Sequence, residues 1–218
     1  MSTYYHVLTA SARIMDPLKY ILTKYAVAPD TPLPIQIQAC RVPHQVQLFH
    51  ELGYRVGAEI GVDRGLFAAD ICQANPGVKL YGIDPWLDYP EYGENYVQPY
   101  ADECHDEAVV RLAAYDVTLI QKFSQEAVEQ FADSSLDFVY IDGNHAYQFV
   151  LDDITAWAPK VRPGGIVSGH DYCRPRNRNR WKFQGVIRAV NDYVAAHKVA
   201  PWFILRGKGC SGWLWVKD

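Results

Sequence analysis

The sequence predicts an α/β protein built on a doubly wound, mostly parallel β-sheet. From residue 43 onward, short apolar segments rich in β-branched residues alternate with helical patterns, and parallel strands need such helical crossovers between them. The last two apolar segments, WFILR (202–206) and GWLWVKD (212–218), are separated by only five residues. That gap is too short for a crossover, so we expect an antiparallel hairpin at one edge of the sheet.

The first part of the chain predicts a helical cap followed by a linker. Apolar residues recur between positions 5 and 25 at an imperfect helical spacing, which favours one or two short helices packed on a larger body. Pro29, Pro32 and Pro34 then interrupt the pattern. We therefore expect an N-terminal helical cap and linker at 1–42 and the α/β domain at 43–218.

The elements of that domain follow from short apolar runs and longer amphipathic ones, taken in chain order. Helices are expected at 44–53, 65–75, 101–114, 124–132, 147–159 and 184–197. Strands are expected at 55–60, 79–84, 117–121, 136–142 and 164–171, with the two segments of the hairpin after them.

Composition limits the function. The chain has 218 residues, of which 49% are hydrophobic, so it can bury one sizeable core. Its net charge of −4 does not favour a nucleic-acid or membrane-surface partner. No uncharged run approaches the length of about eighteen residues that a membrane span needs, and the N-terminus lacks the basic and apolar regions of a secretion signal. We expect a soluble, cytoplasmic protein, and the sequence leaves open whether it forms a homo-oligomer.

The cysteines point to the same compartment. Their number is odd, they are widely scattered, and none forms a CxxC pair, which favours reduced thiols over a disulfide framework or a zinc site. The five are Cys40, Cys72, Cys104, Cys173 and Cys210.

The turn after the first strand of the domain, Glu59-Ile60-Gly61-Val62-Asp63-Arg64-Gly65, is the expected ligand loop. A dinucleotide fingerprint has a glycine where Asp63 stands, and an acidic side chain there opposes a phosphate. Glu59 offers a carboxylate for an amine. Asp84 ends the next strand about twenty residues on, at the spacing typical of ribose recognition. The pattern indicates an adenosine-like ligand with an amino-acid end, although a helix-start turn with a solvated Asp63 explains the loop equally simply.

The segment LDFVYIDGNHAYQFVLDDITAWAPKVRPGGIVSGHDY (136–172) is more specific. It carries I-D-G-x-H at a strand end, D-x-x-x-W on a helix, and G-H-D-Y after R-P-G-G. With the glycine loop, it resembles the class I S-adenosylmethionine-dependent methyltransferases, and among them the macrocin O-methyltransferase type of sugar-modifying enzyme. The resemblance covers roughly residues 53–218. It implies a Rossmann-like seven-stranded sheet in the order 3-2-1-4-5-7-6, with strand 7 antiparallel.

The resemblance also implies roles for particular residues. The cofactor would be S-adenosylmethionine, and its binding residues would be Glu59, Gly61, Gly65, Asp84, Ser124 and Asp142. Asp142 and Asp171 would hold a Mg²⁺ ion, with His170 as a third ligand, beside a hydroxyl of a sugar or glycosylated small molecule. His145 would then take the proton of that hydroxyl. His170 departs from the family pattern, which often has a carboxylate there.

Each of these roles has a simpler alternative. His145 could cap a helix start, and Ser124 could be the N-cap of the helix that begins at SQEAVEQF. Residues 86–100 could form a lid over the substrate or an ordered surface loop. The basic run 174–182 could bind an anionic substrate or be a solvated loop.

Two other functions stay open at this point. One is a nucleotide-linked oxidoreductase on the same fold, which the missing middle glycine disfavours. The other is a binding module that keeps the sheet without the chemistry.

Overall fold

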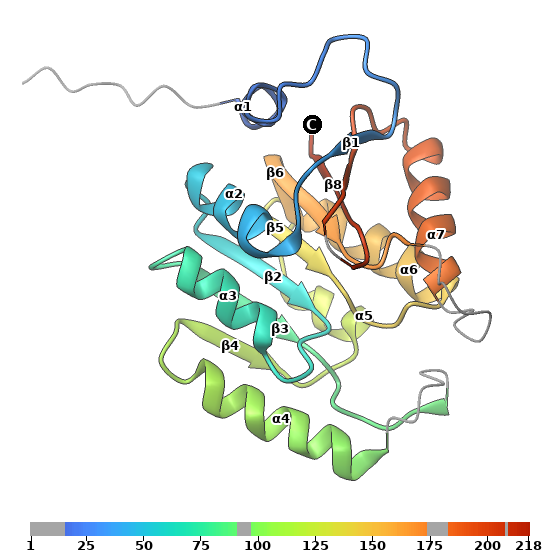
Figure 1. Cartoon of the computed structure of the whole chain (residues 1–218). Coiled ribbons are helices and arrows are strands. Elements are labelled where there is room, and N and C mark those ends of the chain that lie inside the picture. Colours follow the sequence, from blue (N-terminus) through green and yellow to red (C-terminus); the bar gives the residue numbers. More distant parts are fainter. Residues whose placement is uncertain (1–15, 91–96, 174–182, 208) are drawn as a thin grey trace, which may run out of the picture.

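The computed structural model describes residues 16–90, 97–173, 183–207 and 209–218. Its centre is one eight-stranded sheet in the order β1-β7-β8-β6-β5-β2-β3-β4 (Figure 1). The strands are β1 (Ile35–Ile37), β2 (Val56–Ile60), β3 (Lys79–Ile83), β4 (Val117–Ile120), β5 (Leu136–Ile141), β6 (Val161–Gly169), β7 (Phe203–Leu205) and β8 (Gly212–Val216).

The helices connect these strands. They are α1 (Pro17–Lys24), α2 (Val46–Glu51), α3 (Leu66–Ala74), α4 (Gln98–Leu112), α5 (Ser124–Ala127), α6 (Tyr147–Trp157) and α7 (Phe183–Ala196), with a short helical turn, η1 (Arg41–Gln45), before α2. None of the described helices has the length and apolar character needed to cross a membrane.

The sheet has the predicted topology. The strands from β2 onward follow the order 3-2-1-4-5-7-6 when they are numbered from β2, and β8 is antiparallel to both β6 and β7. All the other pairs are parallel, as the helical crossovers require. The doubly wound fold and the antiparallel hairpin are therefore confirmed.

The described sheet has one strand more than the seven expected. The extra strand, β1, comes from the region assigned to the cap and linker, and it pairs in parallel with β7 through Ile35↔Phe203 and Ile37↔Leu205. Both isoleucines are buried while Gln36 between them is exposed, which is the alternation of a strand with one face on a core. Three strand residues directly after Pro34 are too short a run to show that period in the sequence.

Two hydrophobic cores cover the two faces of the sheet. Successive strand residues point to opposite faces, so Phe138 and Tyr140 pack in one core and Val139 and Ile141 in the other. The first core includes residues of α1 to α4, and the second includes residues of α5 to α7 (Figure 1). The carboxyl ends of the parallel strands β2, β3, β5 and β6 therefore meet at one edge between the two helical layers.

Candidate functional site

The loop after β2 packs against the end of β5, and Gly61 makes that contact possible. A Cβ at position 61 would lie 2.4 Å from the Asp142 carbonyl oxygen, and the residue has φ +88°. Gly65 has a different task. It begins α3 at φ 72°, and a Cβ there would lie 3.0 Å from Leu112 Cδ1 in α4. Gly61 lines the cavity beside the loop, whereas Gly65 is a packing residue that is not among the cavity residues.

Asp84 fixes this loop from the end of β3. Its Oδ2 accepts the backbone N–H groups of Val62 and Asp63, both at 3.0 Å, and its Oδ1 accepts that of Trp86 at 2.8 Å. Burial raises the pKa of Asp84, and these three hydrogen bonds oppose the shift. Since each carboxylate oxygen can accept more than one hydrogen bond, Oδ1 keeps accepting capacity toward the cavity that Asp84 lines.

This cavity runs between the ends of β2, β3 and β5, beside α5 and α6. Apolar side chains form much of its wall, as in most small-molecule sites. The lining residues include Ile60, Gly61, Asp63, Ile83, Asp84, Leu87, Tyr89, Phe123, Ser124, Gln125, Asp142, Asn144, Phe149 and Asp153. Of the residues predicted to bind the cofactor, Gly61, Asp84, Ser124 and Asp142 therefore share one cavity.

Ser124 reaches the cavity as part of a buried hydrogen-bond network, not as a helix cap. Phe123 occupies the N-cap position of α5, and no side chain caps it, so the alternative of Ser124 as N-cap is wrong. The Ser124 hydroxyl donates to Asp153 Oδ1 and accepts from Trp157 Nε1 at 3.1 Å. Gln125 Nε2 also donates to Asp153 Oδ1, at 3.2 Å.

Asp153 was not predicted as a site residue. It is 6% exposed, and burial raises its pKa to about 7, against the opposing hydrogen bonds from Ser124 and Gln125. The D-x-x-x-W pattern of residues 153–157 was the available signal, but it does not reveal that the carboxylate points into the ligand cavity.

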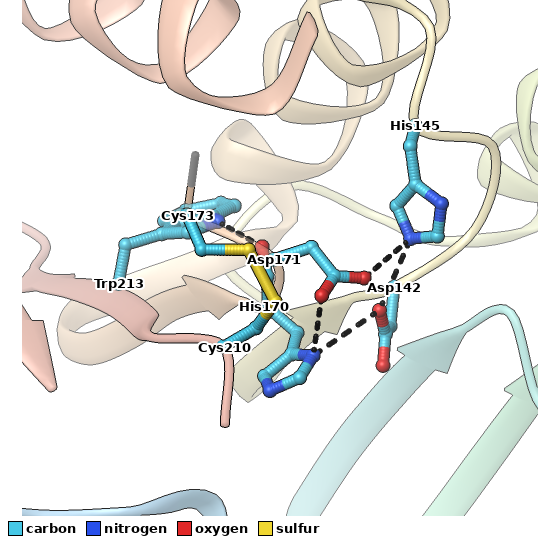
Figure 2. Close-up of a disulfide and its surroundings, with 7 residues drawn as sticks. All are labelled: Asp142, His145, His170, Asp171, Cys173, Cys210 and Trp213. Carbon is cyan, nitrogen blue, oxygen red and sulfur yellow. Dashed lines mark hydrogen bonds and ion pairs between the residues drawn. A yellow bond between two sulfur atoms is a disulfide. The ribbon is translucent and has the colours of Figure 1, made fainter. Parts of the chain in front are cut away.

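Four residues predicted for the chemistry gather at the ends of β5 and β6. His145 Nε2 lies 2.9 Å from Asp171 Oδ2 and 3.5 Å from Asp142 Oδ1. His170 Nδ1 lies 3.3 Å from Asp171 Oδ1 and 3.9 Å from Asp142 Oδ1. Figure 2 shows the Asp171 carboxylate between the two imidazoles, with Asp142 beside it. Asp142 also lines the cavity, so it joins this cluster to the ligand site.

His145 lies in the loop between β5 and α6, two residues before α6 begins. Asn144 shapes this approach to α6: its Oδ1 accepts the Ala146 N–H at 2.9 Å. Burial lowers the pKa of His145, but hydrogen bonds to Asp142 and Asp171 outweigh burial and raise the pKa to about 10. Burial raises the pKa of Asp171, while its hydrogen bonds to His145 and His170 hold it below its ordinary value. The predicted base role needs the neutral imidazole, which these two carboxylates disfavour.

The predicted metal ligands come together. One ligand atom each from Asp142, His170 and Asp171 lies within 4.8 Å of the others, so the residues present fit a divalent cation. Two carboxylates suit Mg²⁺, whereas an imidazole nitrogen in the set shifts the preference toward ions such as Mn²⁺.

The cysteine prediction was wrong for one pair. Cys173 and Cys210 form a disulfide between the loop after β6 and the turn before β8 (Figure 2), while Cys40, Cys72 and Cys104 are free thiols. Thirty-seven residues separate the two cysteines, so their pairing depends on the antiparallel hairpin that returns the chain to β6. The same loop is held by Tyr172 N–H donating to the Ser211 carbonyl at 2.9 Å and by Trp213 Nε1 donating to the His170 carbonyl at 3.1 Å.

Glu59 lies deeper than predicted. It is 2% exposed on β2, it faces the α2–α3 side of the sheet, and it is not among the residues that line the cavity. Arg41, in η1, was not predicted at all. Its Nη1 donates to Asp142 Oδ2 at 3.0 Å, and its guanidinium lies 4.8 Å from the centre of the Phe67 ring.

The structure describes both ends of the segment 86–100, the proposed lid. Trp86 is 1% exposed and its Nε1 donates to the Asp63 carbonyl at 2.9 Å, so it belongs to the core. Tyr89 lines the cavity. Residues 91–96 of that segment, and the whole basic run 174–182, lie outside the described residues.

Several solved structures with this fold are described as O-methyltransferases. An O-methyltransferase from Bacillus cereus, in complex with SAH, is 19% identical, with a TM-score of 0.57, 94% of this chain covered and 91% of that one. A putative caffeoyl-CoA O-methyltransferase from Staphylococcus aureus is 16% identical, with a TM-score of 0.62 and 91% of each chain covered. TomG from Streptomyces achromogenes, involved in tomaymycin synthesis and solved with SAM, is 18% identical, with a TM-score of 0.57 and coverage of 94% and 91%.

Sequence comparison gives the family. The uncharacterized protein y4gI of Sinorhizobium fredii is 27% identical over 159 residues, which are 68% of this chain but 16% of that protein. The chain thus spans about one sixth of this curated relative. A family model described as a methyltransferase domain matches residues 58–172, which include the glycine loop, Asp84, Ser124 and the Asp142–Asp171 cluster. The chain belongs to this methyltransferase-domain family.

Proposed function

We propose that the chain is an S-adenosylmethionine-dependent methyltransferase that methylates a hydroxyl oxygen of a small acceptor, a sugar or a glycosylated metabolite. One observation carries the proposal. Asp142 lines the ligand cavity and at the same time contacts a cluster of two imidazoles and a second carboxylate. A cofactor in the cavity would therefore end beside groups that can orient a hydroxyl and accept its proton.

Different residues of the cavity would bind different parts of the cofactor. Asp84 would accept the ribose hydroxyls with its remaining lone pairs, and Ser124, Gln125 and Asp153 offer polar atoms for the adenine between the rings of Phe123 and Phe149. Gly61 leaves the backbone open to close approach. S-adenosylmethionine would supply an electrophilic methyl group on a sulfonium.

The reaction balances with the groups present. The acceptor oxygen forms a bond to the methyl carbon as the carbon–sulfur bond breaks, and the hydroxyl proton leaves toward the cluster of Asp142, His145 and Asp171. The products are a methyl ether, S-adenosylhomocysteine and a proton. His145 is the base in this proposal, and Asp142 and Asp171 orient its ring. A divalent cation held by these two carboxylates would offset their negative charge and so favour the neutral imidazole that a base needs. Asp142, His170 and Asp171 would hold a divalent cation, and such an ion would lower the pKa of the bound hydroxyl.

Several features of the chain favour a small acceptor. The net charge of −4 gives no attraction for nucleic acid or anionic membrane. The similarity of 136–172 to sugar-modifying enzymes favours a sugar, and neighbours of the same fold bear the name O-methyltransferase. Cytoplasmic location and a homo-oligomeric assembly remain parts of this proposal.

The test is turnover with radiolabelled methyl donor against a panel of sugars, nucleotide sugars and glycosides, with matched amines as competitors for the methyl group. We expect label in methyl ethers. His145→Ala should lower turnover about a hundredfold or more while leaving the affinity for S-adenosylhomocysteine near wild type, and His50→Ala in α2 is the matched control. Chelation should suppress the wild-type activity, and Mg²⁺ or Mn²⁺ should restore it.

Other results would contradict separate parts of this proposal. Label in amines alone would overturn O-methylation. Full activity in chelator would remove the metal and leave His145 as a metal-independent base. A thermal shift with NAD but none with S-adenosylhomocysteine would overturn the cofactor, because only a ligand that binds the native state raises the melting temperature.

A further inference from the structure

Arg41 is a cation that the function described so far does not use. It lies in η1, which follows β1 and directly precedes α2. Its Nη1 donates to Asp142 Oδ2, and its Cζ lies over the ring of Phe67, in the first turn of α3, 4.8 Å from the ring centre. The hydroxyl of Tyr140 and the carboxylate of Glu59 lie close enough to act on its charge. Arg41 therefore stands where the glycine loop, the start of α3 and the end of β5 meet.

Glu59 supplies an independent sign of a missing ligand. Its Oε2 is buried and has no hydrogen-bond partner among the described residues, although an unpaired polar atom in a protein interior costs about 1–3 kcal/mol. Burial raises the pKa of Glu59, and the charge of Asp142 raises it further, whereas the charge of Arg41 lowers it. A cationic ligand group would give this oxygen a partner.

Together, the two side chains offer opposite charges for the two charged groups of a zwitterion. We propose that Arg41 binds the carboxylate of the amino-acid end of S-adenosylmethionine, while the ammonium group of that end faces Glu59. This inference rests on the proposed function. Arg41 has five N–H donors in a planar fork that matches a carboxylate, and the Phe67 ring keeps that plane fixed. Its side chain is 38% exposed, so a ligand can reach it.

The charges also favour a carboxylate over a phosphate of the acceptor. Glu59 and Asp142 flank Arg41, and a doubly charged phosphate would meet two acidic side chains across one guanidinium. The carboxylate of an α-amino acid carries one negative charge, and the ammonium group of the same ligand balances that charge. These charges thus suit an α-amino acid better than a phosphorylated sugar.

The experiment compares two ligands that differ only in this carboxylate. Calorimetry measures the affinity of the full chain for S-adenosylhomocysteine and for its decarboxylated form, in the wild type and in Arg41→Ala, Arg41→Lys and Arg55→Ala. Arg55 is the matched control, because it precedes the opposite end of β2 and its side chain bonds the Pro76 carbonyl. We expect the wild type to prefer S-adenosylhomocysteine by about 10- to 100-fold.

Arg41→Ala should lose that preference by binding S-adenosylhomocysteine more weakly and the decarboxylated form about as before. Arg41→Lys should recover part of it, and Arg55→Ala should match the wild type. If Arg41→Ala weakens both ligands equally, or neither, Arg41 does not bind the carboxylate. If the wild type binds neither ligand, the proposed cofactor itself is wrong, and the inference falls with it. A lower acceptor affinity with an unchanged ligand preference would assign Arg41 to the acceptor instead.

Discussion

Asp153 makes the stability of the protein depend on pH. Its pKa is raised from 3.8 to about 7 by burial, so between about pH 4 and pH 7 the unfolded chain loses a proton that the folded protein keeps. A rise in pH then favours the unfolded state. We predict that the free energy of unfolding of the wild type falls, relative to Asp153→Asn, by a few kcal/mol between pH 5 and pH 8.

Urea denaturation at several pH values measures this difference. Asp152→Asn is the matched control, since Asp152 is the preceding residue of α6, is not buried, and accepts a hydrogen bond from Gln148 Nε2 at the protein surface. Parallel pH curves for the wild type and Asp153→Asn would show that this carboxyl has an ordinary pKa.

At the scale of single residues, the sequence predicted the site residues that follow strand ends. It missed the site residues that helical segments contribute. Asp142, His170 and Asp171 follow strands directly, so their meeting at one edge could be predicted. Arg41 and Asp153 reach the same site from a helical turn and from the second turn of α6. No local pattern indicates that Arg41 will contact Asp142, 101 positions away, or that Asp153 will contact Ser124, 29 positions away.

At the scale of elements, the glycine loop depends on one contact. We predict that Gly61→Ala lowers the free energy of unfolding by about 2–5 kcal/mol, because it adds a left-handed alanine and a methyl group against the backbone of β5. A Cβ there would sit 2.4 Å from the Asp142 oxygen. The variant should also lose measurable affinity for S-adenosylhomocysteine.

Gly53→Ala separates these two causes. Gly53 has φ +70° and open space around its Cβ position, so alanine there meets the backbone strain alone and should cost about 1–2 kcal/mol. Equal losses in the two variants, with cofactor binding intact in Gly61→Ala, would mean that the loop does not approach β5 closely.

The disulfide joins two elements, the loop after β6 and the β7–β8 hairpin. The disulfide joins cysteines that are 37 positions apart, and this loop closure lowers the conformational entropy of the unfolded chain. We therefore predict that reductant lowers the free energy of unfolding by about 2–4 kcal/mol. Denaturation curves with and without reductant test this. The Cys173→Ser/Cys210→Ser variant should show the loss already and no further response, whereas Cys40→Ser should behave as the wild type. An unchanged midpoint in reductant would show that the two thiols are free in solution.

At the scale of the whole molecule, the sequence predicted the order and direction of the strands but not where the sheet ends. Helical crossovers and the short final gap are local signals that predicted the parallel strands and the antiparallel hairpin, whereas the family resemblance implied the strand order from β2 to β8. The pairing of β1 with β7 joins Ile35 to Phe203, and such distant pairing leaves no periodic trace in three residues. The boundary placed near residue 43 therefore cuts through one sheet.

That pairing predicts that a chain beginning at residue 43 will not fold stably. It would lose Ile21, Ile35 and Ile37, which are 0%, 4% and 3% exposed. Burying three such side chains is worth about 5–9 kcal/mol, a large part of the 5–15 kcal/mol that stabilises a typical domain. The cut would also bare the backbone of β7 as an open edge that promotes aggregation. Size-exclusion chromatography and thermal unfolding would compare this chain with one lacking only residues 1–15, which removes none of these contacts. A monomer with an undiminished melting temperature from residue 43 onward would show that β1 covers the sheet without stabilising it.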